Sequence, residues 1–145
     1  MKLARRAVLA WRGLQYRLSA RVAPGARFEW GGEITNILGD RDAIRIGSNT
    51  VVAGQLLTFG HGGRIDIGQW CFVGPGSRIW SSASVRIGDR VLISHGVNIH
   101  DNDAHPLDAA ERHAQYAGIV TRGHPRTGDN VRSAPVVPPA ATRTA

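Results

Sequence analysis

The stretch from residue 93 to residue 108, ISHGVNIHDNDAHPLD, brings imidazoles and carboxylates close together in the sequence. Its three histidines and three acids are His95, His100, His105, Asp101, Asp103 and Asp108. Such side chains can bind a metal ion, or one imidazole can act as a general base with a carboxylate as its support. A polar loop with neither role is the third interpretation. The elements around this stretch decide which side chains can meet.

The acids of this stretch do not complete a calcium-binding loop. Asp101-Asn102-Asp103 matches the start of such a loop. Pro106, after His105, stands at the position where the calcium loop requires a glycine. Arg112 stands at the position of its closing acid. We therefore exclude a calcium site of this type.

The positive charge of the chain belongs to its N-terminal part. The net charge is +7, and seven cationic residues precede the first acid, Glu29. From residue 28 onward eleven basic and eleven acidic residues cancel. A nucleic-acid-binding body would carry a basic face with aromatic residues, so we expect no nucleic-acid partner. The single Cys71 excludes a disulfide framework, and the sequence favours a cytoplasmic protein.

The N-terminal arm, residues 1–27, has the pattern of an amphipathic helix that ends before Pro24-Gly25. Its apolar residues recur every three or four positions: Leu3, Ala7, Trp11, Leu14 and Leu18. We expect this apolar stripe to pack on the folded body. The alternative is peripheral contact of residues 2–21 with anionic lipid at the inner membrane face. Arg12 interrupts the apolar run, which argues against a secretory signal, and we expect no membrane-spanning segment.

A repeat organises residues 28–105. Three segments open with aliphatic-x-Ile-Gly, and their isoleucines Ile46, Ile67 and Ile87 lie 21 and 20 residues apart. Within them, large aliphatic residues recur every six positions: Val52, Val73, Ile79, Val85, Ile93 and Ile99. Each hexad predicts a short strand with one aliphatic turned inward, followed by a polar or glycine corner. Three strands then form one coil, and about three stacked coils form an all-β solenoid.

These hexads resemble the hexapeptide-repeat acyltransferases, which fold as left-handed parallel β-helices. The segment from Ile87 to Asp108 is most similar to the galactoside, maltose and polysaccharide O-acetyltransferases, with its Ile-Gly-Asp, its hexad pair and its His105-Pro106. The resemblance covers roughly residues 30–110 and implies transfer of an acetyl group from acetyl-CoA to a hydroxyl of a sugar or glycan. It also implies a homotrimer with the active site between neighbouring subunits.

The resemblance maps the catalytic histidine of that family onto His105. A free imidazole titrates near ~6.5, so it can take the proton of an attacking hydroxyl at neutral pH. Asp103, two residues earlier, is the predicted support for the imidazole. Asn98, Ser81 and Ser82 are the residues that we expect to meet the acceptor sugar.

Two alternatives remain open. The first is a catalytically impaired β-helix remnant or oligomerisation module, because the hexads stop after Asp108 and Val136-Val137 runs into Pro138-Pro139. This favours a chain truncated at its C-terminus, with residues 106–145 forming a polar loop and a disordered tail. The second is a zinc protein similar to γ-class carbonic anhydrases, with His95 and His100 as a ligand pair. That site needs a third histidine, for which His61 is the candidate, and we expect no metal.

Overall fold

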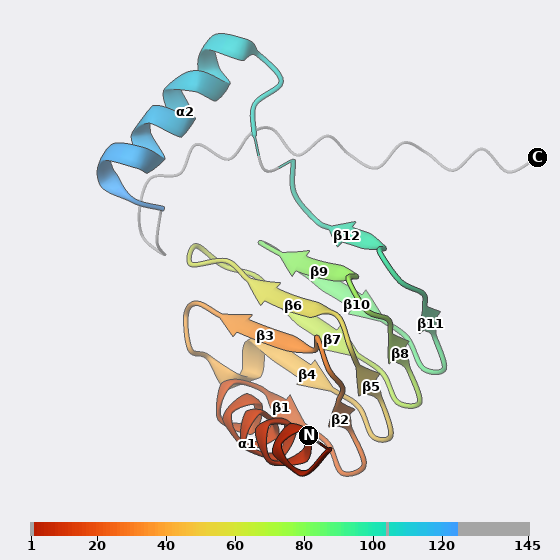
Figure 1. Cartoon of the computed structure of the whole chain (residues 1–145). Helices are drawn as coiled ribbons and strands as arrows, with labels where there is room; N and C mark the ends of the chain where they lie inside the picture. Colours follow the sequence, from red (N-terminus) through yellow and green to blue (C-terminus); the bar gives the residue numbers. More distant parts are fainter. Residues whose placement is uncertain (1, 104, 125–145) are drawn as a thin grey trace, which may run out of the picture.

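The computed structural model describes residues 2–103 and 105–124, with side chains described for residue 8 and from residue 11 onward. Short parallel strands follow one another along most of the chain, and three sheets run the length of the body (Figure 1). The first sheet contains β1 (Arg21–Val22), β4 (Ile44–Ile46), β7 (Ile65–Ile67) and β10 (Val85–Ile87). The second contains β2 (Arg27–Phe28), β5 (Val51–Val52), β8 (Phe72–Val73) and β11 (Leu92–Ile93). The third contains β3 (Glu33–Asn36), β6 (Gln55–Thr58), β9 (Arg78–Ser81) and β12 (Asn98–His100).

Each coil contributes one strand to every sheet, and the described chain forms a parallel β-solenoid of four coils. The predicted all-β solenoid is therefore confirmed. All strand pairs are parallel and join a coil to its neighbour, as in Ile44↔Ile65 and Val85↔Ile65. A short 3₁₀ helix, η1 (Arg41–Ala43), leads into β4.

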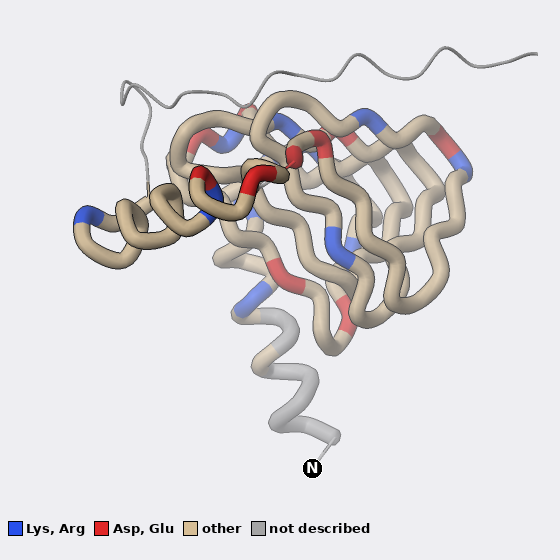
Figure 2. The backbone as a smooth tube through the Cα atoms, turned by 90° about the horizontal axis from the view of Figure 1, so that it is seen from above, with Lys and Arg blue, Asp and Glu red and all other residues tan. Residues whose placement is uncertain are grey.

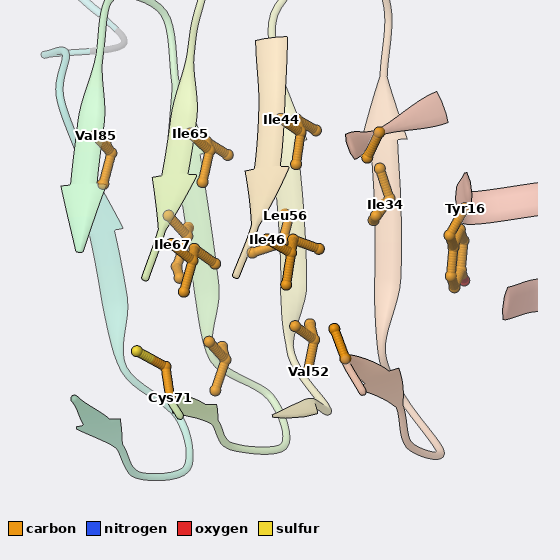
Figure 3. Close-up of a cluster of buried hydrophobic side chains, with 14 of the residues drawn as sticks. Tyr16, Ile34, Ile44, Ile46, Val52, Leu56, Ile65, Ile67, Cys71 and Val85 are labelled. Carbon is orange, nitrogen blue, oxygen red and sulfur yellow. The ribbon is translucent and has the colours of Figure 1, made fainter. Parts of the chain in front are cut away.

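The six-residue period builds the core, as the sequence predicts. Ile46, Ile67 and Ile87 lie side by side in register on the first sheet. Val52, Val73 and Ile93 do the same on the second sheet. These side chains stack in rows inside the coil (Figure 3), and most are buried, as Val52, Val73 and Ile79 illustrate. The strands are too short to bury a face alone, so stacking of coils supplies the core.

The expected number of about three coils is one too low. The first coil contains β1, β2 and β3, and Val22, Phe28 and Ile34 lie six residues apart along it. Ile34 is buried, while Val22 and Phe28 are partly buried against the core. The boundary at residue 27 between arm and body is therefore wrong, because residues 21–27 already belong to the solenoid. The first coil was missed because its corners lack the Ile-Gly pair.

The N-terminal arm forms helix α1 (Lys2–Ser19), as predicted, and it covers the first coil (Figure 1). The side that packs on the coil differs from the expectation. Tyr16 and Ala20 are buried against the coil, whereas Trp11, Leu14 and Leu18 of the predicted apolar stripe are exposed. The Tyr16 hydroxyl donates a hydrogen bond of 3.0 Å to the Gly32 carbonyl, which fixes the rotation of the helix about its axis.

The segment after the last strand also differs from the expected loop. Residues 109–122 form helix α2 (Ala109–Arg122), which begins at Asp108, whose carboxylate accepts a hydrogen bond of 2.9 Å from the Glu111 N–H. An aspartate at this position satisfies a free N–H of the first turn. No residue of α2 is buried, and the helix projects from the solenoid (Figure 1). The predicted disordered tail, from residue 125 onward, lies outside the described residues.

Charges of both signs are distributed over the solenoid (Figure 2). Arg21 and Arg45 both bind the Asp42 carboxylate, at 3.0 and 3.3 Å. The Arg21 hydrogen bond lowers the pKa of Asp42, although the group is exposed. This mixed surface agrees with the balanced charge of the body.

Candidate functional site

The histidine- and acid-rich stretch spans the last strand and the connection from β12 to α2. His95 lies in the corner between β11 and β12, His100 ends β12, and His105 lies in the connection. All three side chains are exposed. The solenoid thus separates these histidines instead of gathering them into one cluster.

Asp101, at the start of this connection, is held by hydrogen bonds to the preceding coil. Its carboxylate accepts hydrogen bonds from the Ser81 hydroxyl at 2.6 Å, the Ser82 N–H at 2.7 Å and the Ala83 N–H at 3.0 Å. The Ser82 hydroxyl adds a longer one at 3.3 Å. Partial burial raises the pKa of Asp101, but these four hydrogen bonds outweigh it, so the pKa lies below its usual range. Asp101 therefore fastens the last coil to the corner of the coil before it.

This contact gives the predicted sugar-binding serines another function. Ser81 is fully buried, and its Oγ also accepts a hydrogen bond of 3.1 Å from the Arg64 N–H. A buried hydroxyl with both a donor and an acceptor partner has no surface to offer a ligand. Ser82 is only half-buried. Asn98 is exposed on β12 beside Arg78 of β9, and its predicted role stays a prediction.

His105 is held by helix α2. Its Nδ1 lies 2.8 Å from Oε1 of Gln115. Because an amide oxygen only accepts, Nδ1 carries the proton and donates it, which leaves Nε2 of the neutral ring as the basic nitrogen. Among the described residues, none forms a hydrogen bond with Nε2. The imidazole is thus exposed and held in one orientation by Gln115.

The partner of this ring is Gln115, a residue that the sequence did not single out, and not the predicted Asp103. Asp103 contacts His105 through the main chain, where its carbonyl accepts the His105 N–H, and its side chain is exposed. The amide of Gln115 comes from ten residues later along the chain. The contact could have been predicted only by recognising helix α2, because the helix brings Gln115 back to the side chain of His105.

An aromatic group lies on the outer face of the third sheet and was also missed. Trp80 pairs with His100 across β9 and β12, and their rings meet edge to face at 5.4 Å. Phe59 approaches the Trp80 ring at 6.5 Å and stacks on His61 at 5.5 Å. The Arg78 guanidinium lies 5.6 Å from the centre of the Trp80 ring. His100 and His61 are therefore engaged with aromatic rings.

A metal site finds no support in this arrangement. Over residues 2–103 and 105–124, no three His, Cys, Asp or Glu side chains form a group that could hold a metal ion. His95 faces Ser94, whose Oγ lies 3.2 Å from its Nδ1, while His100 packs on Trp80. The two histidines thus have different neighbours in the described chain.

Two further findings complete the description of this chain. No helix in the described part is both long and apolar enough to cross a membrane. We compared the chain with models of known protein families, with curated proteins and with solved structures, and none of these comparisons found a match.

Proposed function

We propose that this chain is a CoA-dependent O-acetyltransferase that acetylates a hydroxyl of a sugar or glycan, with His105 as general base. The observation that carries the proposal is the hydrogen bond between Nδ1 of His105 and Oε1 of Gln115, which orients the ring and leaves Nε2 without a described hydrogen-bond partner. The parallel β-solenoid and the His105-Pro106 sequence, with their resemblance to the O-acetyltransferases, support the same assignment. Acetyl-CoA is the acyl donor and hence a substrate.

The residues supply one proton transfer in each direction. Nε2 of His105 removes the hydroxyl proton as the sugar oxygen forms its bond with the carbonyl carbon of the thioester. The carbon–sulfur bond then breaks, and the imidazolium returns the proton to the leaving thiolate. The products are an acetyl ester and a free thiol. Gln115 is a positioning residue, since it holds the ring through Nδ1 throughout this sequence.

The test follows release of the CoA thiol by the full chain with a panel of sugars. We expect His105→Ala to lower the rate by about 100-fold or more, the usual contribution of a general base. His113→Ala is the matched control, because His113 is another exposed histidine on the adjoining helix α2. Equal rates for the wild type and His105→Ala would contradict the proposed base.

Gln115 variants sharpen this test. Gln115→Ala removes the acceptor of the Nδ1–H, and we expect a fall in kcat of about tenfold with KM little changed. Gln115→Glu keeps an acceptor oxygen and should retain more activity than Gln115→Ala. Similar losses in both variants would contradict the positioning role of Gln115.

A non-catalytic assembly module is the second candidate. The last coil favours it, because Leu92 on β11 is 78% exposed, and Val91 and Val97 are exposed as well. Contact between subunits would cover such a surface. A wild-type chain that forms trimers by light scattering, yet releases no thiol with any sugar, would assign the protein to this class.

A further inference from the structure

Helix α1 presents two apolar sides, of which the solenoid uses one. On the inner side, the Tyr16 ring lies 4.6 Å from the Phe28 ring, and Ala20, directly after the end of the helix, is fully buried. The helix contacts all three strands of the first coil, so it lies across the end of the solenoid. The outer side therefore faces away from the coils.

The outer side carries large apolar residues that no described residue covers. Trp11 is 60% exposed, Leu14 62% and Leu18 67%. Their spacing of three and four residues places them on one side of the helix, in line with Val8, which is 44% exposed. Single exposed apolar residues are common on protein surfaces, but a continuous row usually marks a binding surface.

The charge around this row indicates what covers it. Helix α1 itself contains five cationic residues and no acid: Lys2, Arg5, Arg6, Arg12 and Arg17. Arg12 and Arg17 lie beside the exposed row on α1, and the Arg17 guanidinium reaches back to the Val22 carbonyl at 3.2 Å. Two copies of this helix placed face to face would bring two sets of like charges together. An anionic surface complements the arm, and a second copy repels it.

We propose that α1 binds the surface of an anionic lipid bilayer, lying in its plane. Trp11, Leu14 and Leu18 enter the boundary between headgroups and acyl chains, and the arginines remain among the anionic headgroups. The helix has 18 residues and does not have the apolar length to cross the membrane. This inference is independent of the acetyl-transfer proposal, because it uses no residue of that site.

The experiment measures co-sedimentation of the full chain with vesicles. One set of vesicles contains phosphatidylglycerol and phosphatidylcholine, and the other contains phosphatidylcholine alone. The test variant is Leu14→Gln/Leu18→Gln. The matched control is Leu107→Gln/Val120→Gln, which removes two apolar side chains on the connection after β12 and on α2 that are 93% and 65% exposed. Both variants keep the net charge of the chain.

We expect the wild type and the control variant to bind the anionic vesicles, with binding reduced by added salt and weak on phosphatidylcholine. Binding of Leu14→Gln/Leu18→Gln should be at least about tenfold weaker, because its apolar contribution is lost. Equal binding of the two variants, or no binding of the wild type, would overturn the proposal. A change of mass in Leu14→Gln/Leu18→Gln without lipid would also overturn it, because the row would then be a contact between protein chains.

Discussion

The two ends of the solenoid differ in how their coils are covered. At the first coil, α1 lies across the strands, and Tyr16 fills the end of the core with a ring and a hydrogen-bonded hydroxyl. At the last coil, no described helix lies over the strands, and Leu92 is exposed. Two paired core residues show this difference in burial. Ile79 of the third coil is fully buried, whereas Ile99, its neighbour in the last coil, is only partly buried. The core side chains of an inner coil are thus buried by the coils on both sides, and those of an end coil need a cap.

Glycine substitutions at two equivalent corners should show the largest difference between a stacked and an open coil. A Cβ on Gly68 would lie 2.7 Å from the backbone nitrogen of Asp89 in the next coil. We expect Gly68→Ala to lower the free energy of unfolding by about 3 kcal/mol, because backbone cannot move aside cheaply. Gly88 has no described atom within 4 Å of such a Cβ and no positive φ. Gly88→Ala should therefore change stability by less than about 0.5 kcal/mol.

Urea denaturation of both variants measures this comparison. If Gly88→Ala lowers the free energy of unfolding as much as Gly68→Ala does, another part of the chain or a second copy must stack on the last coil. The sequence Thr-Gly-Asp-Asn-Val at 127–131 would then be the first segment to test. It matches Ile-Gly-Asp-Arg-Val at 87–91 in three of five positions.

Asp101 should show the next largest effect, because it fastens the open coil to its neighbour. Asp101→Ala removes the acceptor of the Ser81 hydroxyl and of two backbone N–H groups. We expect a loss of about 2 kcal/mol at neutral pH. Asp103→Ala is the control, because the Asp103 side chain lies two residues away and is exposed. It should leave the free energy of unfolding almost unchanged.

The Asp101 effect also has a defined pH dependence. Its pKa is lowered in the folded chain, so the ionised carboxylate stabilises the fold fully above the ordinary carboxyl value near ~3.9. That contribution is lost as the pH falls through the folded value. The stability difference between the wild type and Asp101→Ala should shrink in acid, as followed by denaturation at pH values from 7 downward. A difference that stays constant would show that Asp101 acts through packing alone.

The cap at the covered end should show the smallest effect. Tyr16→Phe keeps the ring against Phe28 but leaves the Gly32 carbonyl without the hydroxyl that donates to it. We expect a loss of about 1 kcal/mol. Tyr116→Phe removes the same hydroxyl from a residue that is 61% exposed on α2 and should have no effect. Thermal unfolding of the two variants checks the pair, and equal stabilities would mean that the hydroxyl does not fasten α1.

The period of six could be predicted because it is a property of neighbouring residues along each strand. Ile67, Val73 and Ile79 return at that interval and point inward whatever the surrounding loops do. The first coil had the same period in Val22, Phe28 and Ile34, but without the Ile-Gly corner that made the other coils visible.

The orientation of α1 could not be predicted from its hydrophobic pattern. A periodic pattern shows that a helix has an apolar side, but not whether protein or another medium covers it. Here the first coil buries Tyr16 and Ala20, because it offers the Gly32 carbonyl to the Tyr16 hydroxyl and the Phe28 ring as a tilted packing partner.

The site could be predicted in part. His105 was singled out from its neighbours in the sequence, whereas Gln115 reaches it only through the path of α2. The signal for that helix was present in Asp108, which precedes an alanine-rich run with Glu111 three positions on. Ser81 is buried and donates its hydroxyl to Asp101, a contact that the sequence alone does not show, whereas the predicted role of Ser82 stays a prediction.

The regular stacking of coils gives the molecule a defined height. Adjacent strands in a sheet are separated by about 4.8 Å, so four stacked strands span roughly 14 Å, and a helix lying across one end adds about 10 Å. With α1 embedded among the lipid headgroups, the connection that carries His105 would stand roughly 14 Å above them, the height of the four stacked strands. From this height, the proposed base His105 would reach hydroxyl groups that stand away from the membrane surface more easily than those next to it. Adding or removing one coil would change that reach by the separation of two strands.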